Sequence, residues 1–211
     1  MSRTESVAFD NPRRERRADT FAMWVFIGSE AMLFGAIFLV FLVAHLDFGP
    51  AFAAASKHLS VALGAFNTAV LITSSFTMAV AHMFALHRRW RATVWALLAT
   101  SALGVCFLVV KSMEYGKEIA EGMAPLLGLP FRYEGPDPVH AEFFFSLYFT
   151  MTSLHALHLI GGIAVIGGMI ALWRTASPAN RLHRVEAVGL YWHFVDVVWM
   201  FMFPVLYLIN R

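Results

Sequence analysis

The chain carries little charge and almost no cysteine. Only 14% of its 211 residues are Asp, Glu, Lys or Arg, whereas 59% are hydrophobic; soluble domains usually carry about 25% charged residues. The single cysteine, Cys106, lies in an apolar run, which excludes an intramolecular disulfide, a cysteine-ligated metal cluster and a c-type haem motif. The composition therefore indicates a membrane protein and argues against both a soluble enzyme and a disulfide-stabilised secreted domain.

The sequence also lacks an internal repeat and a cleavable signal peptide. Residues 1–20 are polar and rich in arginine, and the apolar run after them is too long for a signal-peptide core and has no small-residue cleavage site. The missing repeat weakens a secondary-transporter interpretation. We expect a cytoplasmic polar tail over residues 1–20 and a single membrane domain over residues 21–211.

Five stretches satisfy the requirement of about 20 mainly apolar residues for crossing a bilayer. They cover residues 21–46, 59–86, 92–113, 143–173 and 185–209. The second stretch is the least hydrophobic because it is rich in Ser and Thr, whose hydroxyl groups can bond to their own helix or to a neighbour. Residues 114–140 contain Gly and Pro steps that exclude a continuous helix. The sequence therefore predicts an all-α membrane protein, a five-helix transmembrane bundle capped by this long outer loop.

Basic residues predict the orientation of the bundle. Eleven of the sixteen Lys and Arg residues lie on one side: five in residues 1–20, three in residues 88–91 and three in residues 174–184. Cytoplasmic segments carry the excess of Lys and Arg in membrane proteins. We expect a cytoplasmic N-terminus and a C-terminus outside.

Glu30 is a carboxyl group about nine residues into the first predicted span. Its helical neighbours Phe26 and Phe34 are apolar, and such surroundings favour the neutral, protonated acid. Glu30 is therefore a candidate proton site or a contact for lipid or a partner subunit. The alternative is a neutral acid that is hydrogen-bonded inside the bundle.

Two further pairs of polar residues share helix faces inside predicted spans. His155 and His158 are three residues apart, as are His193 and Asp196. Three interpretations are open: a haem held by two histidines, a metal site formed with Glu30 or Asp196, or hydrogen bonding between helices. The last interpretation predicts one polar seam of Glu30, His155, His158, His193 and Asp196, with no catalytic residue and no metal ligand.

Three arginines, Arg88, Arg89 and Arg174, stand at predicted cytoplasmic helix ends. A basic residue near an anionic lipid surface contributes about 1 kcal/mol of attraction. They are candidate phospholipid ligands; the alternative is that they only set the topology.

Four segments together resemble subunit III of the haem–copper respiratory oxidases, the cytochrome c oxidase and quinol oxidase family. They are residues 24–34 around Glu30, residues 153–158 with the histidine pair, residues 191–199 (Tyr-Trp-His-Phe-Val-Asp-Val-Val-Trp), and Asn67–Thr68 together with Ala81–His82. Many members have two further spans before the glutamate-bearing one, so this chain looks like the five-span form.

The resemblance implies a non-catalytic subunit of a proton-pumping terminal oxidase in aerobic respiration, in the bacterial plasma membrane. It implies no cofactor in this chain, haem and copper in partner subunits, a main contact with subunit I, and subunit II in the same complex. It also implies bound phospholipid, no nucleic-acid partner, and a stabilising effect on subunit I and its proton supply. Glu30 matches the family's carbodiimide-reactive glutamate, and Arg174 matches a lipid-phosphate position. The accessory subunit of nitric oxide reductase and a bis-histidine cytochrome b are the alternatives.

Overall fold

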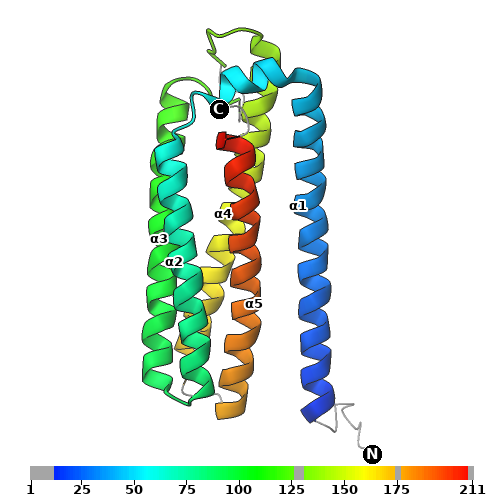
Figure 1. Ribbon diagram of the computed structural model, residues 1–211. Coiled ribbons are helices and arrows are strands. Elements are labelled where there is room, and N and C mark those ends of the chain that lie inside the picture. The colour runs from blue at the N-terminus through cyan, green and yellow to red at the C-terminus, as the bar shows by residue number, and fades with distance from the viewer. Residues whose placement is uncertain (1–11, 126–130, 174–176, 209–211) are drawn as a thin grey trace, which may run out of the picture.

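Five long helices run side by side along the molecule, each antiparallel to the one before it (Figure 1). The computed structural model describes residues 12–125, 131–173 and 177–208, with side chains from Ala18 onward. The helices are α1 (Pro12–Ser56), α2 (Val61–Leu86), α3 (Trp90–Ala120), α4 (Pro138–Ala171) and α5 (Pro178–Phe203), and α5 continues into a short π-helix, η2 (Pro204–Leu208).

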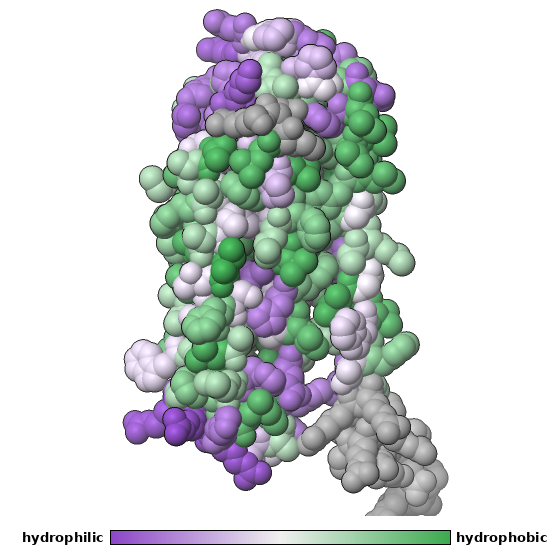
Figure 2. All heavy atoms as spheres, in the orientation of Figure 1, coloured by the Kyte–Doolittle hydropathy of each residue, from purple (hydrophilic) through white to green (hydrophobic). Residues whose placement is uncertain are grey.

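All five helices are long and apolar enough to cross a membrane. The shortest have 26 residues, or about 39 Å at 1.5 Å per residue, against about 30 Å of bilayer hydrocarbon. Figure 2 shows the corresponding pattern, a mainly apolar band between two hydrophilic ends. The predicted five-helix membrane fold is confirmed, and the chain is an integral membrane protein.

The helices extend beyond the predicted spans. Helix α1 already begins at Pro12, inside the predicted tail, and it continues through a kink at Phe48 to Ser56. Helix α3 runs to Ala120 instead of residue 113. Predicted ends lie next to charged residues such as Asp47 and Glu114, although a helix continues through charges that find a partner or reach water.

Caps explain where several helices begin. The side chains of Ser60 and Ser177 accept hydrogen bonds from the backbone N–H of Leu63 and Asn180, at the starts of α2 and α5. Pro138 and Pro178 occupy first-turn positions, where the missing proline N–H costs nothing. These caps add one to two turns ahead of the predicted apolar runs of α4 and α5.

The start of α4 also contacts α1 at its kink. Asp137 caps α4 through the His140 N–H and binds His140 Nδ1 at 2.6 Å, and this hydrogen bond lowers the pKa of Asp137. The His140 ring stacks on Phe48 with 3.7 Å between ring centroids. The described part of the predicted outer loop lies against the same end, where Tyr133 is buried beside His58.

Helix α5 contacts α1, α2 and α4. Two glycines on neighbouring helices leave space for its Trp192 side chain to enter the core. A Cβ atom on Gly104 of α3 or Gly162 of α4 would lie 3.0 or 3.1 Å from the Trp192 ring. Trp192 is fully buried between these helices. Helix α1, in contrast, contacts mainly α4 and leaves most of its surface uncovered.

Candidate functional site

Glu30 and His158 form a direct pair between α1 and α4. Glu30 Oε2 lies 2.9 Å from His158 Nε2, and both side chains are largely buried, at 17% and 14% exposure. The Phe34 ring contacts the imidazole edge-on at 5.2 Å. The surroundings of Glu30 are therefore largely apolar, and its hydrogen-bond partner is His158, a pairing that was not predicted from the sequence.

A single proton lies in the hydrogen bond between Glu30 and His158. His158 Nδ1 lies 2.8 Å from the backbone carbonyl of Leu154, and a carbonyl only accepts, so Nδ1 carries a hydrogen. His158 Nε2 then either accepts a proton from the neutral Glu30 carboxyl or donates one to its carboxylate. Either state is a hydrogen-bonded pair, which is how intramembrane ionisable groups are usually satisfied.

His155 turns away from this pair into the core. It is fully buried, with ring centroids of Phe107 and Trp199 at 5.4 and 5.3 Å, and neither ring nitrogen has a hydrogen-bond partner. His155 and His158 were expected to share one face, but only His158 reaches α1.

His193 and Asp196 face α2 instead of each other. His193 Nδ1 is hydrogen-bonded to Ser75 Oγ at 2.7 Å. Asp196 is 3% exposed, and neither of its carboxyl oxygens makes a hydrogen bond of normal geometry, although Ser75 is its polar neighbour. The five polar residues were expected to form a single seam, but they occupy three separate sites. These are Glu30 with His158, His155 alone, and His193 with Ser75 and Asp196.

In the described part of the chain, no three His, Cys, Asp or Glu side chains converge as metal ligands would. The rings around His155 and the Ser75 bond to His193 also keep the two histidines from facing a common haem. The geometry does not favour the bis-histidine cytochrome interpretation.

The candidate lipid arginines have different surroundings. Arg88 lies in the α2–α3 turn with a left-handed backbone (φ 57°) and lines a hollow of about 480 Å³ together with Trp90 and His183. Arg89 precedes α3 and is exposed. Arg174 lies outside the described residues.

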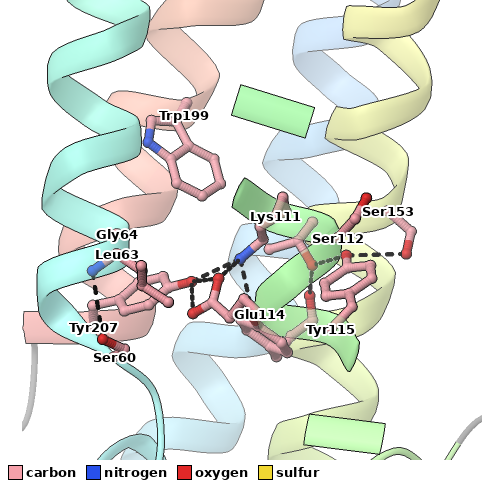
Figure 3. A network of polar contacts seen from close by, with 12 residues as sticks. Ser60, Leu63, Gly64, Lys111, Ser112, Glu114, Tyr115, Ser153, Trp199 and Tyr207 are labelled. Carbon is pink, nitrogen blue, oxygen red and sulfur yellow. Dashed lines mark hydrogen bonds and ion pairs between the residues drawn. The ribbon is translucent and has the colours of Figure 1, made fainter. Parts of the chain in front are cut away.

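The most extensive polar cluster was not anticipated from the sequence. Lys111 is almost fully buried in α3 and donates three hydrogen bonds, to Glu114 Oε2 (2.7 Å), Tyr148 Oη (2.9 Å) and Tyr207 Oη (2.7 Å). Tyr207 in turn donates to the Glu114 carboxylate at 2.8 Å. Figure 3 shows Lys111, Glu114 and Tyr207 meeting between α3 and the end of α5. We call Lys111, Glu114, Tyr148 and Tyr207 the lysine cluster.

The π-helix η2 delivers Tyr207 to the lysine cluster. It begins at Pro204 and turns Leu206 and Tyr207 inward, where both are buried. Gly64 of α2 makes this possible, because a Cβ there would lie 2.8 Å from Phe203 and 3.1 Å from Tyr207. Short π-helical turns frequently mark functional sites, so the cluster is a second candidate site.

One sequence signal could have found the lysine cluster. Lys111 and Glu114 are three residues apart, a spacing that joins side chains on one helix face. The predicted span ended at residue 113, which put Glu114 in a loop. The tyrosine partners come from residues 37 and 96 positions later, and no local pattern connects them.

Fold and sites together define an integral membrane helical bundle with ionisable side chains paired inside it. Residues 15–128 and 129–210 match the sequence profile of the family described as cytochrome c oxidase subunit III. The chain therefore belongs to the cytochrome c oxidase subunit III family, which confirms the resemblance drawn from its motifs.

Three relatives illustrate the range of similarity. The heme-copper oxidase subunit I+III of Aeropyrum pernix is 30% identical over 201 residues, which cover 89% of this chain but only 22% of that longer protein. The cytochrome bo(3) ubiquinol oxidase subunit 3 of Pseudomonas aeruginosa is 28% identical, with 90% of this chain and 84% of the relative covered. The probable quinol oxidase subunit 3 of Staphylococcus aureus is 25% identical, with 95% and 94% covered.

Proposed function

We propose that this chain is the non-catalytic subunit III of a proton-pumping haem–copper terminal oxidase in aerobic respiration. Haem and copper reside in partner subunits, and the chain packs mainly against subunit I, with subunit II in the same complex. Its role is to stabilise subunit I and to keep its proton supply reliable.

Helix α1 is the observation that carries this proposal. The Glu30–His158 pair and the contacts with α4 tie α1 to the bundle, yet only 11% of its most apolar 18-residue window is buried. Large apolar side chains such as Phe21, Met32 and Leu39 are more than half exposed. The Aeropyrum pernix relative carries subunits I and III in one protein, which supports subunit I as the neighbour.

Phospholipid is the second proposed ligand. The hollow beside Arg88 combines a cation with the apolar surfaces of Leu86, Trp90 and Leu182, which suits a phosphate head group above an acyl chain. We assign Arg88, Arg89 and Arg174 to lipid contacts at the cytoplasmic surface. The same proposal includes the orientation and the location of the chain: the N-terminus is cytoplasmic, the C-terminus is outside, and the membrane is a bacterial plasma membrane.

Purification of the native complex through a tag on this chain tests the proposal. Co-purification of subunits I and II, with haem absorption and oxygen consumption, is the expected result. A complex that reduces nitric oxide but not oxygen would support the nitric oxide reductase alternative. A haem spectrum from the chain purified alone would support the cytochrome b alternative.

A second measurement tests the stabilising role. A complex stripped of this chain should reduce oxygen at first and then lose activity during turnover faster than the intact complex, since no electron carrier has been removed. A stripped complex that retains its haems and copper but is inactive from the first turnover would show a direct catalytic role.

A further inference from the structure

A column of titratable side chains enters the apolar band from the end of the bundle where α1 begins. His183 Nε2 lies 3.5 Å from Asp19 Oδ2, and His183 Nδ1 lies 4.0 Å from Glu186 Oε2. Glu186 Oε1 is 3.6 Å from His82 Nε2. Figure 2 shows hydrophilic side chains reaching from this lower end into the apolar band.

Two adjoining hollows lie along the same column. The first, about 800 Å³ between α1, α2 and α5, is lined by His82, His183, Glu186 and His193. The second, about 400 Å³ between α2 and α5, is lined by Ser75, His193 and Asp196. His193 and Ala79 line both hollows, so the two adjoin at these side chains. A water molecule occupies about 30 Å³ of liquid volume, so both hollows have room for water.

The column ends at a buried carboxyl group. Asp196 is 3% exposed and its oxygens make no hydrogen bond of normal geometry. An unpaired charge at such a place is very costly, so the neutral acid is the resting form. The side chains of the second hollow that can pass its proton on toward the first hollow are Ser75 and His193, and the Ser75 hydroxyl is bonded to His193 Nδ1 at 2.7 Å.

We infer that Ser75, His193 and Asp196 form the inner end of a one-sided proton-exchange path that opens, through the two hollows, at the end where α1 begins. In the outward step, the Asp196 carboxyl first forms the hydrogen bond to the Ser75 oxygen that it lacks at rest, and it then gives its proton to that oxygen while the Ser75 hydroxyl gives its own proton to His193 Nδ1. The resulting imidazolium releases its Nε2 proton to water in the first hollow. The serine is unchanged, one proton has moved to water, and the reverse steps reload Asp196.

The path has one polar mouth because the rest of the second hollow is apolar. Beyond Asp196 its lining consists of the buried Leu71 and of apolar side chains exposed on the surface of the bundle, such as Ile72 and Met200. The hydroxyl of Thr68, which also lines it, is engaged by the Trp199 indole N–H at 3.0 Å. Asp196 is the innermost titratable group of this lining.

The titratable and charged groups along the mouth come from all three surrounding helices. They are Asp19 of α1, His82 of α2, and His183, Arg184, Glu186 and His193 of α5. These polar groups share the lining with apolar side chains such as Met23, Phe26 and Leu190, so water is expected along the carboxylates, imidazoles and guanidinium and not throughout the hollow. The inference concerns this chain's own residues and does not depend on the identity of its partner subunits.

Thiol accessibility tests the mouth of the path in membranes that hold the assembled complex. In a Cys106→Ala background, Ala79→Cys places a thiol where the two hollows meet, and Leu98→Cys places the matched control on the exposed face of α3. A membrane-impermeant cationic thiol reagent is added to sealed vesicles of each orientation. The thiol at position 79 should react from the side where α1 begins and not from the other, and the thiol at position 98 from neither.

Hydrogen exchange tests the inner end. The infrared band of the Asp196 carboxyl, identified by its loss in Asp196→Asn, should shift when the complex is moved into D₂O. Ser75→Ala should slow this shift by roughly tenfold or more, since a positioned acid–base group typically contributes 10²–10⁴. Thr73→Ala removes a hydroxyl from the same helix away from the path and should leave the rate unchanged.

Three results would overturn the inference. The first is a thiol at position 79 that reacts no faster than the one at position 98, which would show a hollow filled by lipid or by another subunit. The second is equal reaction from both sides, which would show a second mouth. The third is an exchange rate that Ser75→Ala leaves unchanged.

Discussion

Replacing Lys111 by Met removes the centre of the lysine cluster while keeping an unbranched side chain of similar length. The ammonium group donates to Glu114, Tyr148 and Tyr207, and it lies within 5.6 Å of four aromatic ring centroids. The substitution leaves the Glu114 carboxylate buried, with Tyr207 as its remaining donor.

The expected loss in the free energy of unfolding comes from the Glu114 carboxylate, which stays buried without its ammonium partner. Removing one partner of a buried ion pair typically costs about 3–5 kcal/mol, because the other charge stays uncompensated. Adding Glu114→Gln to Lys111→Met should therefore restore part of the free energy of unfolding, because the amide is neutral and still accepts from Tyr207. Tyr207→Phe should cost less, about 1–3 kcal/mol, because it removes one hydroxyl and leaves the ion pair.

The free energy of unfolding is measured by sodium dodecyl sulfate titration of the purified chain in mixed micelles, with helicity as the signal. Lys117→Met is the matched control, since Lys117 lies in the same helix and pairs with Glu121 at 3.7 Å while about half exposed. An exposed pair contributes about 0–1 kcal/mol. Equal losses for Lys111→Met and Lys117→Met would refute the reasoning, as would a double variant no more stable than Lys111→Met alone.

Three further predictions concern other parts of the bundle. A hydrophobic carbodiimide should label Glu30 in the intact complex, and Glu30→Gln should abolish the label without preventing assembly; label that persists in the variant contradicts the assignment. Gly162→Ala should lower the thermal stability in detergent because its Cβ meets Trp192 at 3.1 Å, whereas Gly167→Ala on the same helix has open space and should not. Because the hydrogen bond to His140 lowers the pKa of Asp137, its stabilising effect is present above the ordinary Asp value and is lost as pH falls through the lowered one. Asp137→Asn should therefore weaken the loss of thermal stability toward acid pH, and an unchanged profile would show that this contact does not contribute.

Span number and type were predictable because bilayer thickness imposes a length and an apolarity that local sequence displays. The exact ends were not. Pro138 and Pro178 begin helices one or two turns ahead of the apolar runs, and α3 continues for seven residues past its predicted end. Polar helix ends that reach water or find partners leave no trace in an apolarity count.

The candidate polar residues were identifiable, since carboxyl and imidazole groups inside apolar runs stand out. Their partners were not, because each partner lies on a different helix. Glu30 meets His158 across 128 positions and His193 meets Ser75 across 118. A spacing of three says that two side chains share a helix face, but the rotation of that helix in the bundle decides what they meet.

The signature segment of α5 makes sense once α2 is placed beside it. Trp192 and Trp199 are seven residues apart, and their indole N–H groups donate to Ser74 and Thr68, which are six residues apart on the antiparallel α2. Each hydroxyl gives its own hydrogen to a carbonyl of α2, Ser74 to Leu71 and Thr68 to Gly64, and so offers a lone pair to the indole.

This arrangement explains how the Ser- and Thr-rich α2, which was expected to be the least hydrophobic span, packs against α5, whose mean hydropathy is in fact lower (1.4 against 1.7). Inside a bilayer a hydroxyl or an indole N–H must find a partner within the protein, and here each satisfies the other across the α2–α5 contact. The His193–Ser75 bond lies directly beside the Trp192–Ser74 contact on the same pair of helices. The hydroxyl-rich face of α2 and the Trp-His-Asp-Trp face of α5 are therefore two halves of one recognition surface, and Asp196 is the member of that surface left without a hydrogen-bond donor.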